Sequence, residues 1–241
     1  MAVQSRFIEY EHNGDKLEAY FAWDDAVQGE RPGVLVAHPW AGRNADCEGV
    51  VRQLAAMGYA GFALDMYGKG ILADSREECA RLMEVQTRDR QALQARMLKA
   101  LEMLQTQPEV QADNIAAWGY CFGGLCVLDL ARTGTQDVRG VVSFHGLLHP
   151  PEQKAIQRIQ TSILVLHGHE DPMAPPDSVS ALKDELTQAQ ADWQIHVFGQ
   201  AMHAFTNPNA NDKAFGTVYD ERATQRSWTM AVDFLAECLR D

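Results

Sequence analysis

The sequence has no excess of positive charge: 21 lysine and arginine residues stand against 33 aspartate and glutamate residues, which gives a net charge of −12. Because no basic cluster interrupts this acidity, we expect no nucleic-acid partner and no anionic membrane partner. The sequence also lacks an apolar run approaching the ~18 residues of a membrane span, and its first residues lack the apolar centre of a signal peptide. We therefore expect neither secretion nor membrane spanning.

Cysteine is scarce as well, and the five cysteines form no closely spaced pair. An odd number without pairing argues against a disulfide framework and fits a reducing compartment, so we predict a cytoplasmic location. Four of them fall in predicted helices, where packing in the core explains them: Cys47, Cys79, Cys126 and Cys238. The fifth, Cys121, lies instead in a glycine-rich segment.

Motifs for nucleotide cofactors are absent, since neither Gly-x-Gly-x-x-Gly nor Gly-x4-Gly-Lys-Ser/Thr occurs. Two histidine pairs, His145 with His149 and His167 with His169, invite a zinc interpretation. They lack a strand-paired carboxylate or a Cys-x-x-Cys motif, and prolines follow His149 where an i, i+4 pair would need a helix. We expect no metal and no cofactor.

The stretch around Cys121 is the most informative part of the sequence. Four mostly apolar residues, 115–118, run into Gly-Tyr-Cys-Phe-Gly-Gly, and an apolar segment at 125–131 follows at once. This pattern predicts a strand, a sharp turn and a helix, with the central residue strained and its side chain directed outward as in a nucleophile elbow. A β-carbon at Gly119 or Gly123 would strike the neighbouring backbone. Cys121 takes the usual place of serine and predicts a thiol nucleophile; the alternative is a buried structural cysteine.

Two further polar residues follow predicted strands. Asp171 lies just past the buried strand 163–168, and His203 follows the alternating strand at 193–198. The carboxyl ends of parallel strands meet at one edge of a sheet, and ligands bind there. The order nucleophile, acid, histidine is also the order of a triad in this kind of fold. We predict a catalytic triad of Cys121, His203 and Asp171.

These motifs resemble those of the dienelactone hydrolase family of α/β-hydrolases. The elbow at 119–124, the strand-Gly-x-x-Asp motif at Asp171 and the Gly-x-x-His-x-Phe motif ending at Phe205 carry the resemblance, which extends from about Gly33 to the C-terminus. It implies hydrolysis of a small ester or lactone, of the carboxymethylenebutenolidase type, by the predicted triad. General carboxylesterases and thioesterases share the same catalytic residues, so they remain an alternative.

A second loop is predicted to complete the site. The apolar strand 34–37 ends in His-Pro-Trp, and in this fold the loop after that strand supplies one backbone N–H of the oxyanion hole. Pro39 has no N–H to donate, so we assign the two backbone donors to Trp40 and to Phe122, which follows the nucleophile.

Contacts to the substrate are less defined by the sequence. His38 either contacts substrate or packs as a support of the loop, and Tyr67 either lines the pocket or packs in the core. Arg76, Arg81 and Arg88 could meet an anionic substrate, but a solvated helix face is the favoured interpretation.

The sequence departs from the family pattern at two places. Pro39 stands where enzymes acting on dienelactone carry a glutamate that helps to form the thiolate, and Thr206 and Asn207 stand where such enzymes place a carboxylate-binding arginine. These departures weaken the case for dienelactone itself as the substrate. The remaining activators of the thiol are His203, acting as a base, and the dipole of the helix after Cys121.

The overall pattern predicts one α/β domain over residues 1–241. Short apolar strands alternate with helical segments, so we expect an α/β-hydrolase fold with a mostly parallel central sheet flanked by helices and no large cap. The segments 7–10 and 17–23 flank a turn and predict an antiparallel hairpin at the sheet edge. A third functional alternative is a non-catalytic binding or redox-sensing module that uses Cys121 as a reactive thiol.

Overall fold

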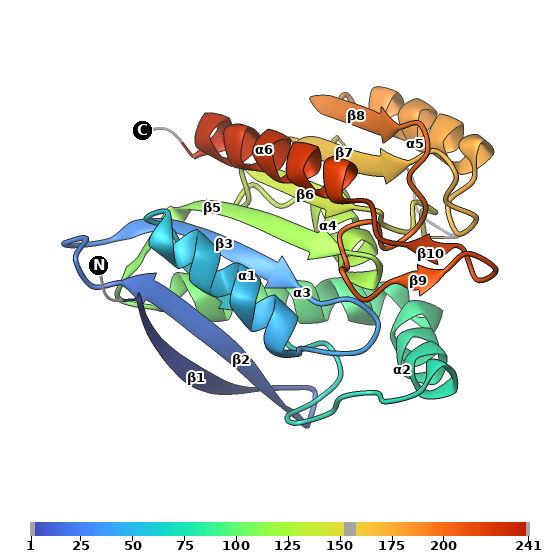
Figure 1. The fold of residues 1–241 in the computed structure, drawn as a ribbon. Coiled ribbons are helices and arrows are strands. Elements are labelled where there is room, and N and C mark those ends of the chain that lie inside the picture. The colour runs from blue at the N-terminus through green and yellow to red at the C-terminus, as the bar shows by residue number, and fades with distance from the viewer. Residues whose placement is uncertain (1–2, 152–157, 240–241) are drawn as a thin grey trace.

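The computed structural model describes residues 3–151 and 158–239 and is built on an eight-stranded sheet (Figure 1). The strand order is β1-β2-β4-β3-β5-β6-β7-β8. β1 and β2 form an antiparallel hairpin at the edge, β2 pairs antiparallel with β4, and the remaining pairs are parallel. The strands are β1 Val3–His12, β2 Asp15–Asp24, β3 Arg31–Ala37, β4 Ala60–Ala63, β5 Val110–Tyr120, β6 Gly140–Phe144, β7 Ser162–Gly168 and β8 Trp193–Phe198. The predicted edge hairpin and mostly parallel sheet are confirmed.

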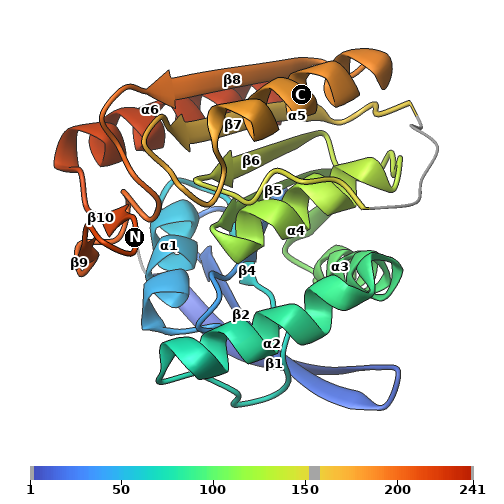
Figure 2. The same cartoon turned by 90° about the vertical axis from the view of Figure 1, so that its right-hand side faces the viewer.

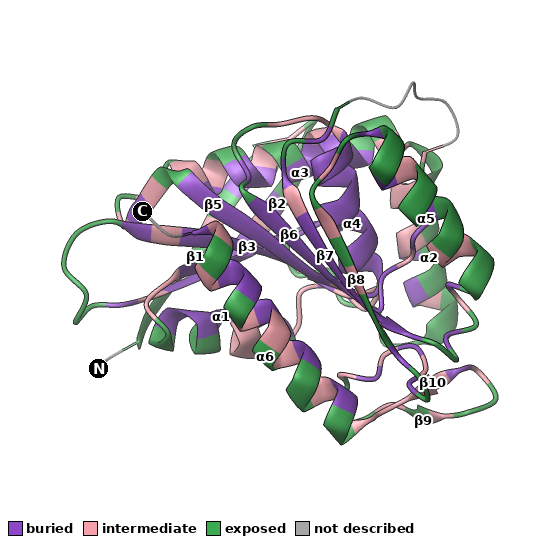
Figure 3. Ribbon diagram, turned by 90° about the horizontal axis from the view of Figure 1, so that it is seen from above, coloured by how far each residue is buried: buried purple, intermediate pink, exposed green. Residues whose placement is uncertain are grey.

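Helices cover both faces of this sheet, as Figure 2 shows. One face packs against α1 Ala45–Ala56 and α6 Glu221–Cys238. The other packs against α3 Arg90–Gln105, α4 Phe122–Arg132 and α5 Pro176–Gln188. The central strands are therefore buried on both sides, while the outer faces of the helices are exposed (Figure 3). This arrangement explains why the central strands are apolar along their whole length.

Side-chain caps determine where several helices begin. Asn44 accepts a hydrogen bond from the Cys47 N–H at 3.2 Å and begins α1. Asp89 has an extended backbone and accepts from two N–H groups of the next turn at 3.0 Å. It therefore separates α2 Arg76–Arg88 from α3, and α2 is an independent helix beyond the carboxyl end of the sheet (Figure 1).

A buried ion network joins α3, α4 and α5. Asp129 is fully buried and accepts two hydrogen bonds of 2.6 Å from Arg90 and one of 3.1 Å from Arg132. Arg132 also donates two bonds of 2.8 Å to Glu185. Because each charge has an opposite partner, the network ties the three helices together, although its net contribution to stability is smaller than its number of bonds suggests.

Candidate active site

The elbow forms between β5 and α4, and Cys121 is its central residue. Cys121 has φ 55° and ψ −116°, a conformation that non-glycine residues rarely adopt and that indicates local strain. A β-carbon on Gly119 would overlap the backbone of Gly123, and one on Gly123 would overlap the carbonyl group of Ala37. The prediction that both glycines are required by close backbone approach is confirmed.

The structure brings Cys121, His203 and Asp171 together at the carboxyl end of the sheet. Nδ1 of His203 donates to Oδ2 of Asp171 at 2.8 Å, and both side chains are buried. Among the residues that the structure describes, Nε2 of His203 has no nitrogen or oxygen partner, and its interaction is with the thiol of Cys121. The carboxylate therefore orients the imidazole so that its free edge faces the sulfur.

Electrostatics at this cluster favour a thiolate beside an imidazolium. Burial raises the pKa of Cys121, but the charge and hydrogen bond of His203 and the backbone N–H groups of Phe122 and Trp40 outweigh it, and the pKa lies below the ordinary value. Burial likewise lowers the pKa of His203, but the sulfur of Cys121 and the hydrogen bond to Asp171 raise it to about 10. Each group of the pair thus stabilises the charged form of the other.

The two backbone groups predicted as oxyanion donors both act on the Cys121 sulfur. Tyr67 braces them, because its hydroxyl donates to the carbonyl of Trp40 at 2.9 Å and its ring stacks on Phe122 at 5.7 Å. Tyr67 is largely buried, so the structure places it as a packed residue under the site as well as a neighbour of Cys121.

His38 lies fully buried beside this loop. Its Nδ1 donates to the Pro39 carbonyl at 2.7 Å, and its Nε2 accepts from the Met66 N–H at 3.1 Å. Both ring nitrogens are therefore occupied by the backbone, and burial holds the pKa of His38 below its ordinary value. This geometry fits the packed alternative for His38 and leaves no ring nitrogen for substrate.

Sequence reasoning considered His145 only as a metal ligand and missed its position beside the triad. Its ring meets that of His203 edge to face at 5.1 Å, and its Nε2 lies 2.7 Å from the hydroxyl of Thr206. Burial and the charge of His203 hold the pKa of His145 well below the ordinary value, which favours the neutral form of the ring. The available signal was its place directly after β6, at the same edge of the sheet.

A short hairpin after His203 was also missed. β9 Asn211–Asp212 pairs with β10 Thr217–Val218, and these strands are too short to give an alternating pattern. The backbone of His203 bonds to this hairpin on both sides: its N–H donates to Gly216 at 3.0 Å and its carbonyl accepts from Val218 at 3.2 Å. The hairpin therefore holds the backbone of His203 in place.

The three arginines considered as anion contacts are all paired with carboxylates. Arg76 pairs with Asp212 at 2.7 Å, Arg88 with Glu84 at 2.8 Å and Arg81 with Glu78 at 3.9 Å. Their side chains are largely exposed, which fits the solvated face favoured by the sequence.

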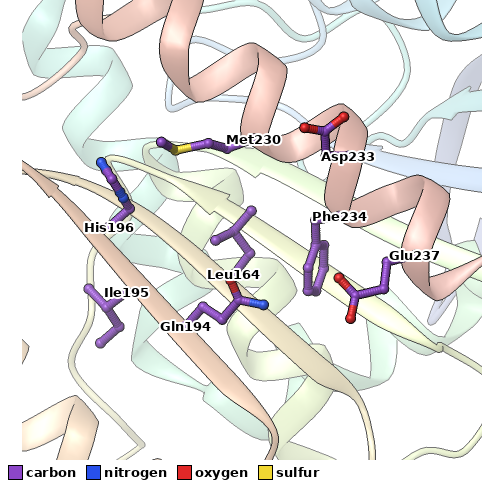
Figure 4. A pocket seen from close by; sticks show the side chains of 8 residues that line it. All are labelled: Leu164, Gln194, Ile195, His196, Met230, Asp233, Phe234 and Glu237. Atoms are coloured by element: carbon purple, nitrogen blue, oxygen red, sulfur yellow. The ribbon is translucent and has the colours of Figure 1, made fainter.

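A separate hollow of about 310 Å³ lies between β8 and α6 (Figure 4). It is lined by Leu164, Gln194, Ile195, His196, Met230, Asp233, Phe234 and Glu237, and none of the triad residues faces it. Within residues 3–151 and 158–239, no three His, Cys, Asp or Glu side chains gather in a metal-binding arrangement. Over the same ranges, no helix combines the length and apolarity needed to cross a bilayer.

The mostly parallel sheet, the helices on both faces and the strained elbow between β5 and α4 define an α/β-hydrolase fold. A model of the dienelactone hydrolase family matches residues 17–239. The chain therefore belongs to the dienelactone hydrolase family, which is a family of hydrolases.

Solved structures support this assignment, and a curated relative is similar over part of the chain. The protein m3DLH is 36% identical, with both chains covered completely and a TM-score of 0.94. A dienelactone hydrolase-like promiscuous phosphotriesterase from metagenomic libraries is 35% identical, again over 100% of both chains, with a TM-score of 0.95. An uncharacterised protein of Caenorhabditis elegans is 38% identical over 147 residues, which are 60% of this chain and 93% of that protein.

Proposed function

We propose that this protein hydrolyses small, uncharged esters or lactones by acyl transfer through Cys121, His203 and Asp171. The observation that carries the proposal is the buried arrangement in which Asp171 orients His203 and the free edge of that imidazole faces a strained cysteine. A nucleophile, a base and an orienting group in this order are what acyl transfer requires.

In the first half of the reaction, the Cys121 thiolate attacks the carbonyl carbon and forms a carbon–sulfur bond. The negative charge moves to the carbonyl oxygen, which takes over the N–H groups of Trp40 and Phe122 that act on the sulfur at rest. The carbon–oxygen bond to the alcohol then breaks, and Nε2 of His203 gives its proton to the leaving alkoxide. The product of this half is a thioester on Cys121.

In the second half, the neutral imidazole of His203 removes a proton from water, and the resulting hydroxide attacks the thioester. Asp171 accepts the hydrogen bond from Nδ1 throughout and stabilises the imidazolium that forms. The carbon–sulfur bond breaks, the acid leaves, and Cys121 returns as a thiolate beside an imidazolium. A glutamate at the position of Pro39 is not needed for this cycle, because His203 and the two backbone donors already favour the thiolate.

An uncharged substrate is favoured by the surroundings of the site. Arg76, Arg81 and Arg88 are each engaged by a carboxylate, and Thr206 is engaged with His145. Because each of these arginines already has a carboxylate partner, none of them offers an unpaired cation to a substrate carboxylate, whereas a neutral ester needs none.

Intact-mass spectrometry tests the proposal. A panel of lactones and activated esters, with lactam and peptide controls, is expected to leave a transient acyl adduct on the wild-type protein. Cys121→Ala should lose both the adduct and turnover, whereas Cys238→Ala, which removes a thiol from α6, should keep both. Comparable turnover by Cys121→Ala would refute the assignment of the nucleophile.

A second candidate activity is hydrolysis of neutral phosphotriesters at the same site. It is favoured by the similarity to a phosphotriesterase that is 35% identical over the whole chain. Attack of the thiolate on phosphorus with loss of an aryloxide would give an S-phosphoryl enzyme that water then cleaves. A phosphoryl adduct on Cys121, absent in Cys121→Ala, would support this activity.

The non-catalytic alternative makes a different prediction. A redox-sensing module would show oxidation of Cys121 by peroxide but no acyl or phosphoryl adduct with any compound of the panel. That combination of results would overturn both proposed activities.

A further inference from the structure

Three side chains from three separate segments stack beside the active site. The guanidinium of Arg76, at the start of α2, lies 4.5 Å from the centre of the Phe215 ring. Phe215 lies in the turn between β9 and β10, and its ring stacks on Trp40 at 5.9 Å with an interplanar angle of 21°. Trp40 belongs to the loop after β3 and supplies one of the two backbone N–H groups that act on Cys121. The stack of Arg76, Phe215 and Trp40 therefore ends on a residue whose backbone N–H is a predicted oxyanion donor.

Phe215 is held in place by its own hairpin and by α2. Its N–H donates to Oδ1 of Asp212 at 2.9 Å, while Oδ2 of the same carboxylate accepts from Arg76 at 2.7 Å. The next residue, Gly216, has φ 87° and packs so closely on Pro172 that no β-carbon would fit there. The ring thus sits on a braced turn, close to where Gly216 bonds to the backbone of His203.

The backbone of Trp40 is held by hydrogen bonds on both sides, and its indole is the part that meets Phe215. The Pro39 carbonyl shares a peptide unit with the Trp40 N–H and accepts from Nδ1 of His38 at 2.7 Å and from the Gly42 N–H at 3.1 Å. The Trp40 carbonyl, in the next peptide unit, accepts from Tyr67 at 2.9 Å, and the Trp40 side chain is only partly buried. Gly42, two residues later, has φ 100°, so the loop turns sharply just past the donor. The direction of a backbone N–H depends on the torsion angles around it, and an indole without a neighbour would leave these angles less restricted.

We propose that Phe215 is a positioning residue, which holds the indole of Trp40 so that the backbone N–H of Trp40 stays directed at the reacting atoms, and that Arg76 and Asp212 hold Phe215. This inference rests on the proposed acyl-transfer function, since it concerns the oxyanion donor of that reaction. The β9–β10 hairpin then positions two groups of the site. Its backbone holds His203, and the ring of Phe215 holds Trp40, which carries the oxyanion donor.

Loss of the ring has a defined consequence for kinetics. A donor displaced by about 1 Å costs on the order of 10²-fold in rate, so Phe215→Ala is expected to lower kcat by ~10–100-fold with little change in KM. The same change should shift the pH profile of Cys121 alkylation by iodoacetamide toward higher pH, because the Trp40 N–H contributes to the lowered pKa of the thiol. Phe215→Tyr keeps the ring and should restore both values.

The matched control is Phe7→Ala. Phe7 is also an aromatic residue with an arginine over its ring, at 5.2 Å from Arg43, but it lies on β1, and its ring contacts that of Tyr20 edge to face. Its loss should leave kcat and the alkylation profile unchanged.

On α2, Arg76→Gln should lower kcat by up to about fivefold, because the ion pair is exposed. Arg88→Gln, which removes a comparable pair with Glu84 on the same helix, should have no effect.

A double-mutant cycle separates positioning from direct substrate contact. In a Trp40→Ala background the backbone N–H remains but the indole is absent, so Phe215→Ala should have little further effect on kcat. An undiminished effect in that background, or a change confined to KM, would overturn the proposal in favour of a substrate contact. A wild-type alkylation profile for Phe215→Ala would overturn it as well. The alkylation assay needs no substrate, so it tests the positioning role even if the proposed hydrolysis fails.

Discussion

Replacing Asp171 by asparagine should impair the second half of the proposed reaction far more than the first. The carboxylate accepts two hydrogen bonds of 2.8 Å: Oδ1 accepts from the Met173 N–H, and Oδ2 accepts from Nδ1 of His203. An asparagine has one acceptor oxygen and one donor amide in these two positions. Because the Met173 N–H can only donate, the oxygen must face it, and the amide NH₂ must then face His203.

This arrangement would reverse the tautomer of the imidazole. With a donor opposite Nδ1, the ring keeps its proton on Nε2, which faces Cys121, and can no longer accept a proton from water at that atom. In serine triads, the corresponding change lowers kcat by about 10⁴-fold, which is equivalent to about 5.4 kcal/mol of barrier. We expect Asp171→Asn to lower steady-state kcat by ~10³–10⁴-fold, because hydrolysis of the thioester needs an unprotonated Nε2 to take the proton of water.

Acylation by a chromogenic ester should be affected less, since its aryloxide leaves without taking a proton from the imidazole, and Nε2–H can still donate a hydrogen bond to the Cys121 thiolate. A rapid-mixing assay with a chromogenic ester should therefore show a retained burst followed by a much slower steady state, and mass spectrometry should show accumulated acyl enzyme. Asp177→Asn, at the exposed start of α5, is the control and should behave as the wild type. A steady-state kcat within tenfold of the wild-type value, in a variant with unchanged thermal unfolding, would refute the reasoning.

Three further predictions concern the elbow, the ion network and pH. Gly123→Ala should prevent stable folding, measured by soluble yield and urea unfolding, whereas Gly49→Ala, in open space on α1, should raise the free energy of unfolding by up to ~1 kcal/mol. Asp129→Ala should lower the free energy of unfolding by ~3–5 kcal/mol, because it leaves the buried guanidinium of Arg90 without its carboxylate partner; a loss near zero would contradict this. His203→Gln should shift Cys121 alkylation to higher pH, and the stability that the raised His203 pKa provides, complete below pH ~6.5, should disappear as pH rises through about 10.

The proximity of the three triad residues could be predicted because each follows a strand of one parallel sheet. Once the segments 115–120, 163–168 and 193–198 are recognised as parallel strands of one sheet, the residues after them must share an edge. The elbow glycines were predictable for the same local reason, since a tight strand-to-helix turn leaves no space for a β-carbon. Short-range rules were sufficient for these features.

Other features depend on residues that are far apart in the sequence and follow no short-range pattern. Arg90 meets Asp129 across 39 positions, and Arg132 meets Glu185 across 53, so neither pair follows from helical spacing. The β9–β10 hairpin has strands of two residues each, too short for periodicity to indicate them. Its contacts with Trp40 and His203 form only when the whole fold is assembled.

The β9–β10 hairpin contacts both the backbone of His203 and the indole of Trp40, and this has a consequence for engineering. Residues 38–44 and 203–218 behave as one interlocked module, because the first carries Trp40 and the second carries both His203 and Phe215. A loop graft that takes only one of these segments from a relative would replace one side of the contact between Trp40 and Phe215 and leave the other side unchanged. We expect chimeras that exchange both segments at once to keep turnover and to acquire the substrate range of the relative from which the segments come.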